Sequence, residues 1–360
     1  MRVLLIVRPS ADERSGGDLT QARFTRRALE AAGVHADIVP ALDPDVSGYD
    51  LAHVFGVFDP EICAVQVRAC RRAGVPVALS PIWWDLYEFF GRSRECERIL
   101  AGSARHVETK LARLRQTSTA KLFRRGEMHK YARRIAAQTA LMRQADVLLP
   151  NSAIEGHYYV HQLRLHDRPI VVVHNPVDVP ESAARTSPRR GVVCVARIEQ
   201  KKNQAMLLYA LRGLDADVTL IGGSHDQPYM DLCRRWMTTR VRVAGNLSHD
   251  DVLRELANAA VHVLPSWAET PGIANLEAAA AGARVAVSNN GTECEYFGEL
   301  AEYVDPEEPT AIRAAVERLL ALPPRAPDDA LAMRLRAFDA GMVGKRTLEG
   351  YRLALRAFSP

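Results

Sequence analysis

Short runs of strand-forming residues alternate with helical segments along the first third of the chain. The runs are apolar and rich in β-branched residues, and the segments between them carry apolar residues at helical spacing. The predicted strands cover residues 3–7, 36–39, 51–55 and 75–79, and the predicted helices cover residues 22–32 and 63–72. Buried strands that alternate with helices predict a parallel sheet with right-handed crossovers.

A second alternating series begins at Gly191. Its strands are predicted at 192–196, 218–221, 241–244, 261–264 and 285–287. One predicted helix ends at residue 211, and two others cover 251–259 and 275–281. Two shorter runs, 145–150 and 170–173, are also predicted strands. We therefore expect two doubly wound domains, with a ligand at the carboxyl ends of their sheets.

The expected domain limits follow from these two series. Residues 1–178 form the first domain and residues 191–344 the second, joined by a linker at 179–190 that is rich in Pro, Ser, Ala and Arg. The tail is predicted to be an amphipathic helix at 345–358. We expect the whole segment 345–360 to pack back on the first domain.

Residues 91–144 interrupt the alternation with a strongly basic segment. It holds fourteen Lys or Arg and four Glu, whereas the whole chain has a net charge of +4. Val107, Leu111 and Leu114 keep helical spacing, so we expect amphipathic helices with a cationic face in the first domain. A solvated face and attachment to an anionic membrane surface both remain open. Nucleic acid is disfavoured because aromatic residues are sparse and no recognition motif occurs.

Composition excludes several classes of protein. Hydrophobic residues make up 48% and charged residues 25%, which is ordinary for a globular protein. No apolar run reaches the roughly 18 residues that span a bilayer, and the first apolar run is interpreted as a buried strand rather than a signal peptide. The six cysteines show neither a CxxC pair nor zinc-site spacing, which indicates reduced thiols in a cytoplasmic protein.

The clearest candidate chemistry lies at residues 265–278, after a predicted strand. Backbone N–H groups at the start of the following helix favour an anion, and Pro271 supplies none of them. The residues expected to supply these groups are Gly272, Ile273 and Ala274. Glu269 and Glu277 flank them, and because carboxylates accept hydrogen bonds from hydroxyls, we expect a sugar or ribose there. An acid that favours the helix dipole and a solvated helix position are the alternative interpretations of these two residues.

Two further strand ends carry candidate residues. Arg197 and Lys202 bring two cations to one strand end, where they can neutralise a diphosphate without a metal; surface charge on a loop is the alternative. Gly16 and Gly17 follow the first strand. They lack the full GxGxxG spacing, so a plain flexible turn competes with a turn that lets a ligand approach the backbone.

Together, these residues resemble the retaining family 4 (group 1) glycosyltransferases of GT-B architecture, over nearly the whole chain. Glu269 and Glu277 match the E-x7-E motif of that family, and Arg197 and Lys202 match its Arg-x4-Lys pair. Further matches are the Gly16-Gly17 turn, the Asn175-Pro176-Val177-Asp178 linker entry, and the loop Gly245-Asn246-Leu247-Ser248 that borders the nucleotide base.

The resemblance implies an α/β GT-B fold, in which two facing Rossmann-like domains hold the donor site in the cleft between them. It implies that Glu269 contacts the donor sugar and Glu277 the nucleotide ribose, while Arg197 and Lys202 hold the diphosphate. The expected activity is retaining, metal-independent transfer of a hexose from a UDP- or GDP-sugar, with no cofactor. The expected acceptor is a glycan or lipid-linked hydroxyl in bacterial cell-surface polysaccharide or lipopolysaccharide assembly, at the inner face of the plasma membrane.

One departure from the family keeps other functions open. Trp84 stands where the family usually has a histidine, so Trp83, Trp84 or His53 is expected to make the sugar or acceptor contact; His53 is otherwise a core histidine. A nucleotide-sugar-binding protein without turnover and an enzyme like the UDP-N-acetylglucosamine epimerases are the alternatives. An NAD-dependent dehydrogenase is disfavoured because GxGxxG is absent.

Overall fold

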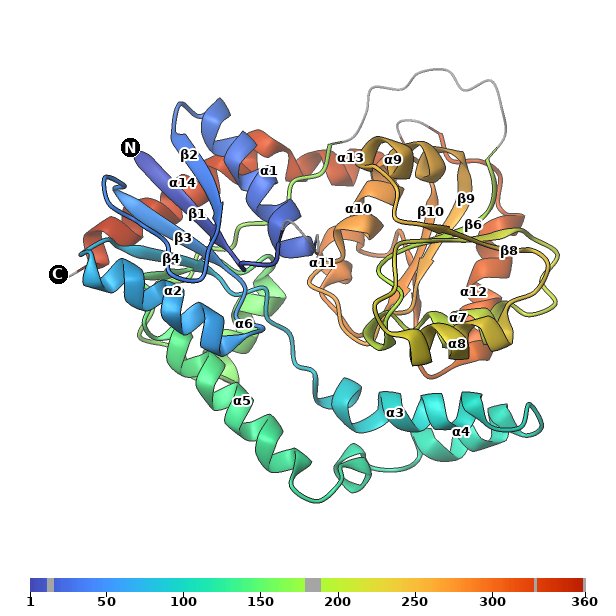
Figure 1. Cartoon of the computed structure of the whole chain (residues 1–360). Coiled ribbons are helices and arrows are strands. Elements are labelled where there is room, and N and C mark those ends of the chain that lie inside the picture. The colour runs from blue at the N-terminus through green and yellow to red at the C-terminus, as the bar shows by residue number, and fades with distance from the viewer. Residues whose placement is uncertain (12–15, 179–188, 327–328, 359–360) are drawn as a thin grey trace. The chain divides into compact units, whose positions relative to one another are not determined.

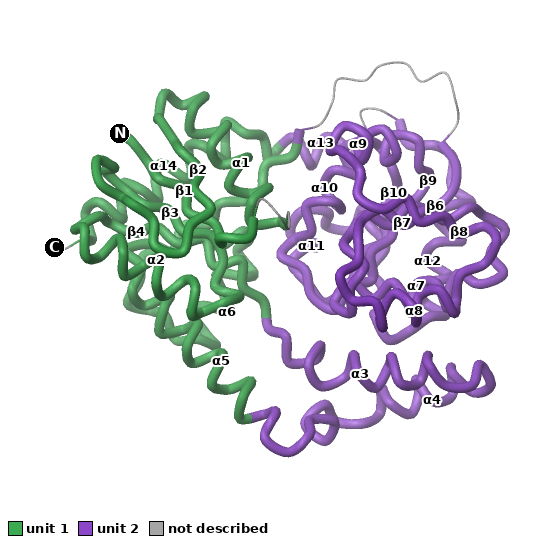
Figure 2. Tube along the Cα trace, viewed as in Figure 1, with its two compact units in different colours: residues 1–84, 129–177, 337–360 green, residues 85–128, 178–336 purple. Residues whose placement is uncertain are grey.

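The computed structural model describes residues 1–11, 16–178, 189–326 and 329–358 (Figure 1). It divides the chain into two compact units, coloured in Figure 2. Unit 1 comprises residues 1–84, 129–177 and 337–360, and unit 2 comprises residues 85–128 and 178–336. Each unit holds one parallel sheet covered by helices, which confirms the predicted α/β fold with two doubly wound domains. Most of the predicted linker, residues 179–188, lies outside the described residues.

Unit 1 is built on a sheet of five strands in the order β2-β1-β3-β4-β5. Its strands are β1 (Arg2–Val7), β2 (His35–Pro40), β3 (Leu51–Phe55), β4 (Val77–Ser80) and β5 (Val147–Leu148). Its helices are α1 (Gly17–Ala31), α2 (Pro60–Arg72), α5 (Glu127–Met142), α6 (Ala153–His161) and α14 (Ala340–Ala357). Every neighbouring pair is parallel; Leu5, for example, is in register with Ile38 on one side and His53 on the other.

Alternate residues of β1 point to opposite faces of this sheet. Leu5 joins a buried cluster with side chains of α1 and α14, whereas Leu4 and Ile6 join a second cluster with α2 and α5. Because successive side chains of a strand face opposite ways, a wholly apolar strand needs cover on both faces. The helix α14 supplies part of that cover by packing against α1 (Figure 1).

Unit 2 contains a sheet of six parallel strands in the order β11-β10-β9-β6-β7-β8. Its strands are β6 (Arg190–Val195), β7 (Val218–Ile221), β8 (Val241–Gly245), β9 (Ala259–Leu264), β10 (Arg284–Ser288) and β11 (Glu302–Val304). Its helices are α3 (Tyr87–Ala101), α4 (Val107–Arg115), α7 (Gln204–Leu211), α8 (Gln227–Trp236), α9 (His249–Asn258), α10 (Ile273–Ala280), α11 (Glu293–Phe297), α12 (Pro309–Ala321) and α13 (Ala330–Leu335). Short 3-10 turns stand at η1 (Thr119–Leu122) and η2 (Gln200–Lys202), and η3 (Arg336–Phe338) begins at the last residue of unit 2 and continues into unit 1.

The whole basic segment was expected to lie in the first domain, but only part of it does. Residues 91–128 are part of unit 2, where α3 and α4 pack side by side (Figure 1). The physical reason lies in α7, whose eight residues are all buried. A helix that is apolar on every side must be covered on every side, and α3 covers α7 together with α8 and α12.

Local boundaries also differ from those expected. Residues 170–173 form only an isolated bridge from Ile170 to Leu148, not a strand. The predicted helix 63–72 begins earlier, at Pro60, because the Asp59 carboxylate accepts hydrogen bonds from the first-turn N–H groups of Glu61 and Ile62. All six cysteines are free thiols, and Cys294 alone among them is exposed. Within the described residues, no helix combines the length and hydropathy needed to cross a bilayer.

Candidate functional site

The strand order of unit 2 reverses between β6 and β9. The chain proceeds from β6 to β7 and β8 on one side, then returns to place β9 on the other side of β6. Loops that leave such a switch point diverge and open a crevice at the carboxyl ends of the strands. Arg197 and Lys202 follow β6, and Glu269 follows β9, so the topology brings these predicted residues to one edge of the sheet.

Lys202 and Glu269 form an ion pair at this edge. The Lys202 ammonium donates a hydrogen bond to Glu269 Oε1, and the Ser266 hydroxyl donates a second one to the same oxygen at 2.8 Å. The two charged side chains are 15% and 7% exposed. Burial alone would raise the pKa of Glu269, but the charge of Lys202 and the hydrogen bonds outweigh it, and the pKa is lowered. Glu269 is therefore an ionised acceptor.

Arg197 lies nearby on the same loop but is freer. Its side chain is 47% exposed, and its guanidinium lies 3.4 Å from the Glu199 carboxylate. An exposed pair at this distance contributes little stability. Arg197 can therefore leave Glu199 for an incoming anion at little cost.

Glycines let three strand ends approach one another closely. Gly222 has φ of +136°, and a Cβ there would collide with the carbonyl oxygen of Ala196. At Gly223, a Cβ would lie 2.8 Å from the side-chain amide of Asn246. Asn246 is exposed in the loop between β8 and α9. The structure thus places it beside the loops after β6 and β7, at the edge that carries Arg197.

A tight turn at Gly272 precedes α10. Gly272 has φ of +38°, and a Cβ there would lie 2.7 Å from Asn275 Nδ2 and 3.3 Å from Glu269 Oε2. Ile273 and Ala274 follow in the first helical turn, where backbone N–H groups have no acceptor within the helix. This turn therefore directs amides to the region beside Glu269.

Glu277 lies one helical turn further, within α10. Its carboxylate is 18% exposed and lies 3.8 Å from His249 Nδ1. Burial, assisted by the charge of Asp178, raises the pKa of Glu277 to about 7. Glu277 is a partly covered acid and not a fully solvated one, so the simple surface interpretation does not hold.

A buried polar cluster, which no sequence motif indicated, lies beside Glu269. The backbones of Glu269 and Gly291 form an isolated bridge, which brings the chain after β10 next to the chain after β9. There Asn275 Nδ2 donates to Glu293 Oε1 at 3.4 Å. Three buried atoms of this cluster have no hydrogen-bond partner among the described residues: Asn275 Oδ1, Thr292 Oγ1 and Glu293 Oε2. Burial, together with the charge of Glu269, raises the pKa of Glu293 to about 8. The available signal was the position of Thr292 and Glu293 after β10, the strand that pairs with β9.

Two of the three residues of unit 1 that were expected to contact the sugar or acceptor are buried in the core. His53 is buried, and its ring nitrogens lie 2.9 Å from Tyr351 Oη and 2.9 Å from Ser80 Oγ. The Trp83 side chain is 4% exposed, and its indole N–H donates to Gln138. Neither offers a contact surface here, because its polar atoms already have partners inside unit 1. Trp84 differs, since it is only half-buried, with its ring tilted against Tyr158.

Gly16 and Gly17 have different local roles in the same unit. Gly16 is extended and precedes α1; a Cβ there would lie 2.7 Å from Asp18 Oδ1 and 2.8 Å from Arg8 Nη2. At Gly17 a Cβ would meet open space. Gly16 thus leaves room for the side chains of the Arg8–Asp18 ion pair, whose ends would have to shift around a Cβ. A role of either glycine toward a ligand stays a prediction.

The described part of the chain holds no group of three or more His, Cys, Asp or Glu side chains that is arranged to bind a metal ion.

Comparisons with known proteins give similarities at three levels. The model of the family described as glycosyl transferases group 1 matches residues 180–334. The glycogen synthase of Mycobacterium tuberculosis is 30% identical over 239 residues, which cover 61% of this chain and 57% of that protein. The chain therefore spans a little over half the length of this relative.

Solved structures match over almost the whole chain. Sucrose-phosphate synthase from Thermosynechococcus elongatus gives a TM-score of 0.72 at 17% identity, over 99% of this chain and 100% of that chain. Anabaena HepE in complex with UDP and glucose gives 0.68 at 15% identity, over 98% and 99%. At these identities the similarity establishes a shared fold.

Proposed function

We propose that the chain transfers a hexose from a nucleoside diphosphate sugar to an acceptor hydroxyl, with retention of configuration, because the model of the glycosyl transferases group 1 family matches residues 180–334. The observation that carries the proposal is the meeting of Lys202, Glu269 and the Arg197 loop at the β6–β9 switch point. Two cations beside an ionised carboxylate match a ligand that joins a diphosphate to a polyol.

Each residue has a distinct role in the proposed transfer. The bond between the anomeric carbon and the diphosphate oxygen breaks, its electron pair leaves with the nucleoside diphosphate, and a bond to the acceptor oxygen forms. Negative charge thus develops on the diphosphate, where Lys202, Arg197 and the amides at the start of α10 stabilise it. Glu269 accepts hydrogen bonds from sugar hydroxyls, and Glu277 accepts them from the ribose. The proton of the acceptor hydroxyl leaves with the departing phosphate or to solvent.

The ion pair of Lys202 and Glu269 also prepares the site for its ligand. In the free protein each charge neutralises the other within a largely buried setting. When a donor binds, the diphosphate provides a new partner for Lys202 and the sugar hydroxyls provide one for Glu269. Little reorganisation is then needed, because both side chains are already held at the crevice.

We propose a UDP- or GDP-sugar as donor and a reaction independent of metal. HepE, which shares the fold, was solved with UDP and glucose. Arg197, Lys202 and the α10 amides supply the positive charge that a metal ion would otherwise bring. A panel of UDP- and GDP-sugars, analysed by mass spectrometry for released nucleoside diphosphate, tests both points. We expect release from at least one donor, unchanged by chelator; release from none, or a strict need for Mg²⁺, would contradict the respective point.

The acceptor is proposed to be a glycan or a lipid-linked hydroxyl of cell-surface polysaccharide or lipopolysaccharide assembly, reached at the cytoplasmic face of an anionic membrane. The supporting observation is a group of exposed basic side chains on the unit 2 part of the basic segment. They are Arg105, Lys110, Arg113, Lys121, Arg124 and Arg125. Each Lys or Arg near an anionic surface contributes about 1 kcal/mol to binding.

A nucleotide-sugar-binding protein without turnover is the second candidate function. It is favoured by the core position of His53, which cannot replace the histidine expected at the Trp84 position while both of its ring nitrogens have partners. The donor panel separates the two functions. A binder would show affinity for a nucleoside diphosphate sugar without releasing nucleoside diphosphate, whether or not acceptors are added.

A further inference from the structure

The segment 85–128 packs directly against the elements that carry the proposed donor site. α3 contacts α7, α8 and the η2 turn, which ends at Lys202. Its side chains Cys96, Ile99 and Leu100 join the buried cluster that includes Trp267, two residues before Glu269. A segment that the chain inserts between β4 and β5 thus borders both loops of the site.

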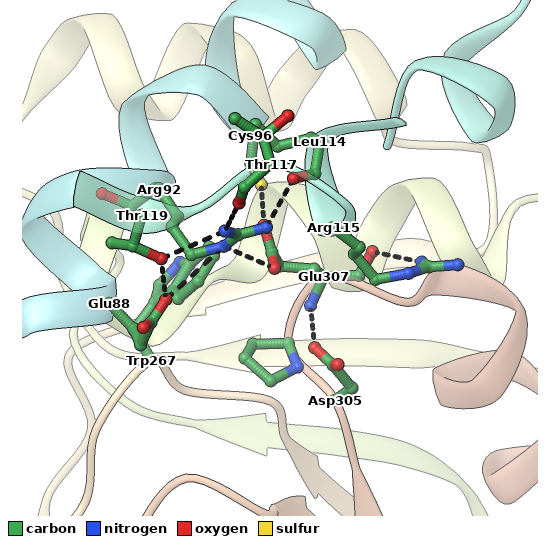
Figure 3. A network of polar contacts seen from close by, with 12 residues as sticks. Glu88, Arg92, Cys96, Leu114, Arg115, Thr117, Thr119, Trp267, Asp305 and Glu307 are labelled. Carbon is green, nitrogen blue, oxygen red and sulfur yellow. Dashed lines mark hydrogen bonds and ion pairs between the residues drawn. The ribbon is translucent and has the colours of Figure 1, made fainter. Parts of the chain in front are cut away.

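Arg92 is the main polar link of this packing, as Figure 3 shows. Its Nε donates to Glu307 Oε2 at 2.7 Å, and Nη2 donates to the Leu114 carbonyl at 2.8 Å. Its Nη1 donates to the Thr117 carbonyl at 2.8 Å and to Thr119 Oγ1 at 3.1 Å. The Arg92 and Glu307 side chains are only 6% and 9% exposed. A buried pair is expensive to desolvate, and one that is bonded this completely fixes a single arrangement.

Glu307 is held from several directions at once. Its second carboxylate oxygen, Oε1, accepts a hydrogen bond from Cys96 Sγ at 3.4 Å. Its carbonyl accepts one from Arg115 Nη1 at 3.2 Å, and its N–H donates to Asp305 Oδ1 at 2.8 Å (Figure 3). The helices α3 and α4 therefore determine where the loop between β11 and α12 lies.

Asn203 connects that loop to both loops of the site. Its Nδ2 donates to the carbonyl of Pro306 at 2.8 Å and to the carbonyl of Pro265 at 3.1 Å. Asn203 directly follows Lys202 in the chain, and Pro265 begins the loop that carries Glu269. The Asn203 side chain is buried, at 4% exposure. The amide of Asn203 thus ties the Lys202 loop to the Glu269 loop and ties both loops to Pro306, the residue before Glu307.

A second contact leads from α3 to the same site. The helix α3 contacts the η2 turn, and Glu97 of α3 lies close to Gln200, which begins that turn. The backbone of this turn also bonds to the other loop, because Trp267 N–H donates to the Lys201 carbonyl at 2.9 Å. The contacts from Arg92 through Glu307 and Asn203 therefore reach the same two loops that α3 contacts directly.

We propose that Arg92, acting through Glu307 and Asn203, is a positioning residue that holds Lys202 and Glu269 at the separation required to bind the nucleoside diphosphate sugar. The inference rests on the proposed function of that site. Arg92 touches neither Lys202 nor Glu269 itself, so it sets their geometry without contributing to the chemistry.

The test compares wild type with Arg92→Gln and Glu307→Gln in the full chain. Affinity for UDP and GDP is measured by calorimetry, kcat and KM are measured for the donor, and thermal unfolding is followed in parallel. We expect both variants to lose about tenfold in nucleoside diphosphate affinity and in kcat/KM at a temperature where they are fully folded. Arg92→Lys keeps the charge and should recover part of the loss.

The matched control is Arg94→Gln on the same helix. Arg94 pairs with Glu127 at 2.8 Å, the two side chains are 31% and 32% exposed, and that pair lies outside the Arg92 network. We expect this control to stay within about twofold of wild type. If Arg92→Gln and Glu307→Gln lower only the unfolding temperature and match the control in affinity and kinetics, the positioning role is overturned.

A double-mutant cycle tests the route through Asn203. If Arg92 acts through that amide, Arg92→Gln combined with Asn203→Ala should lose little more affinity than Asn203→Ala alone. Fully additive losses would contradict the route. Failure of the proposed function gives a different result: wild type itself would bind neither UDP nor GDP and release neither from a sugar donor, which would overturn the positioning role as well.

Discussion

The Lys202 ammonium group donates a hydrogen bond to the Glu269 carboxylate, across 67 positions of the chain. The pair joins the loop after β6 to the loop after β9, the two strands that are neighbours in space where the strand order reverses. Because both side chains are largely covered, neither charge can be removed without leaving the other poorly compensated. The two loops therefore form one proposed site, and replacement of each of its residues should change a different step of binding or transfer.

The two glutamates should fail in different ways when they are replaced. Glu269→Ala should damage sugar transfer, because it removes the acceptor for sugar hydroxyls. Glu277→Ala should mainly weaken nucleoside diphosphate binding, because it removes the acceptor for the ribose. Titration of the free nucleoside diphosphate against each variant checks this.

The pKa of about 7 at Glu277 also predicts how this loss of affinity changes with pH. The ionised carboxylate accepts hydrogen bonds better than the neutral acid, so the loss of affinity in Glu277→Gln should grow from about pH 6 to about pH 8. Equal affinity of the Glu277 variants and wild type throughout this range would contradict the ribose contact.

Glu293 should make the protein less stable as pH rises. Its pKa is about 8 in the folded chain against 4.5 as the ordinary value, so between these values the folded state holds a proton that the unfolded state has released. The stabilisation is complete below about pH 4.5 and is lost as pH rises through about 8. Thermal unfolding is measured at about pH 6 and about pH 9. The unfolding temperature of Glu293→Gln relative to wild type should be higher at pH 9 than at pH 6.

The exposed Glu299, on the same short stretch of chain, provides the control. Glu299→Gln should follow wild type at both pH values. A difference between Glu293→Gln and wild type that does not change with pH would show that the buried carboxyl is not titrating in this range.

The alternation of apolar runs and helices predicted both sheets because the central strands, such as β3 and β9, are buried along almost their whole length, and this pattern depends only on local sequence. The docking of α3 and α4 on unit 2 could not be predicted in the same way. It depends on α7, whose wholly apolar surface requires cover but does not specify which helix supplies it. The helical spacing of apolar residues within 91–144 correctly predicted helices there.

The positions of several candidate residues also follow from the sequence pattern. Arg197, Lys202 and Glu269 meet because the carboxyl ends of parallel strands share one edge of a sheet. His53 differs, because its core role depends on Tyr351, nearly 300 residues later in the chain. Glu293 was missed because its proximity to Glu269 arises from the pairing of β9 with β10, which no short motif encodes.

The basic segment should bind anionic vesicles at low salt and release them as salt rises, because exposed charges are screened. Co-sedimentation with vesicles of rising anionic lipid content measures this. Replacing Lys121, Arg124 and Arg125 together by Gln should reduce the bound fraction. A matched triple replacement of Arg240, Arg242 and Arg254, which are exposed elsewhere on unit 2, should not. Equal sedimentation of both triple variants, or indifference of wild type to anionic lipid, would favour an acceptor in solution.

The most direct test of the account is donor turnover by Arg197→Ala. Arg197 is nearly half exposed and only loosely paired, so its removal should leave the fold intact. Loss of its contact with the leaving diphosphate should lower turnover by about 10²-fold or more, equivalent to about 2.7–4 kcal/mol. Lys202→Ala should act in the same direction. Arg242→Ala, which removes an exposed arginine of β8, should behave as wild type. Nucleoside diphosphate release at the wild-type rate by both Arg197→Ala and Lys202→Ala would contradict the assignment of this edge of the sheet as the diphosphate site.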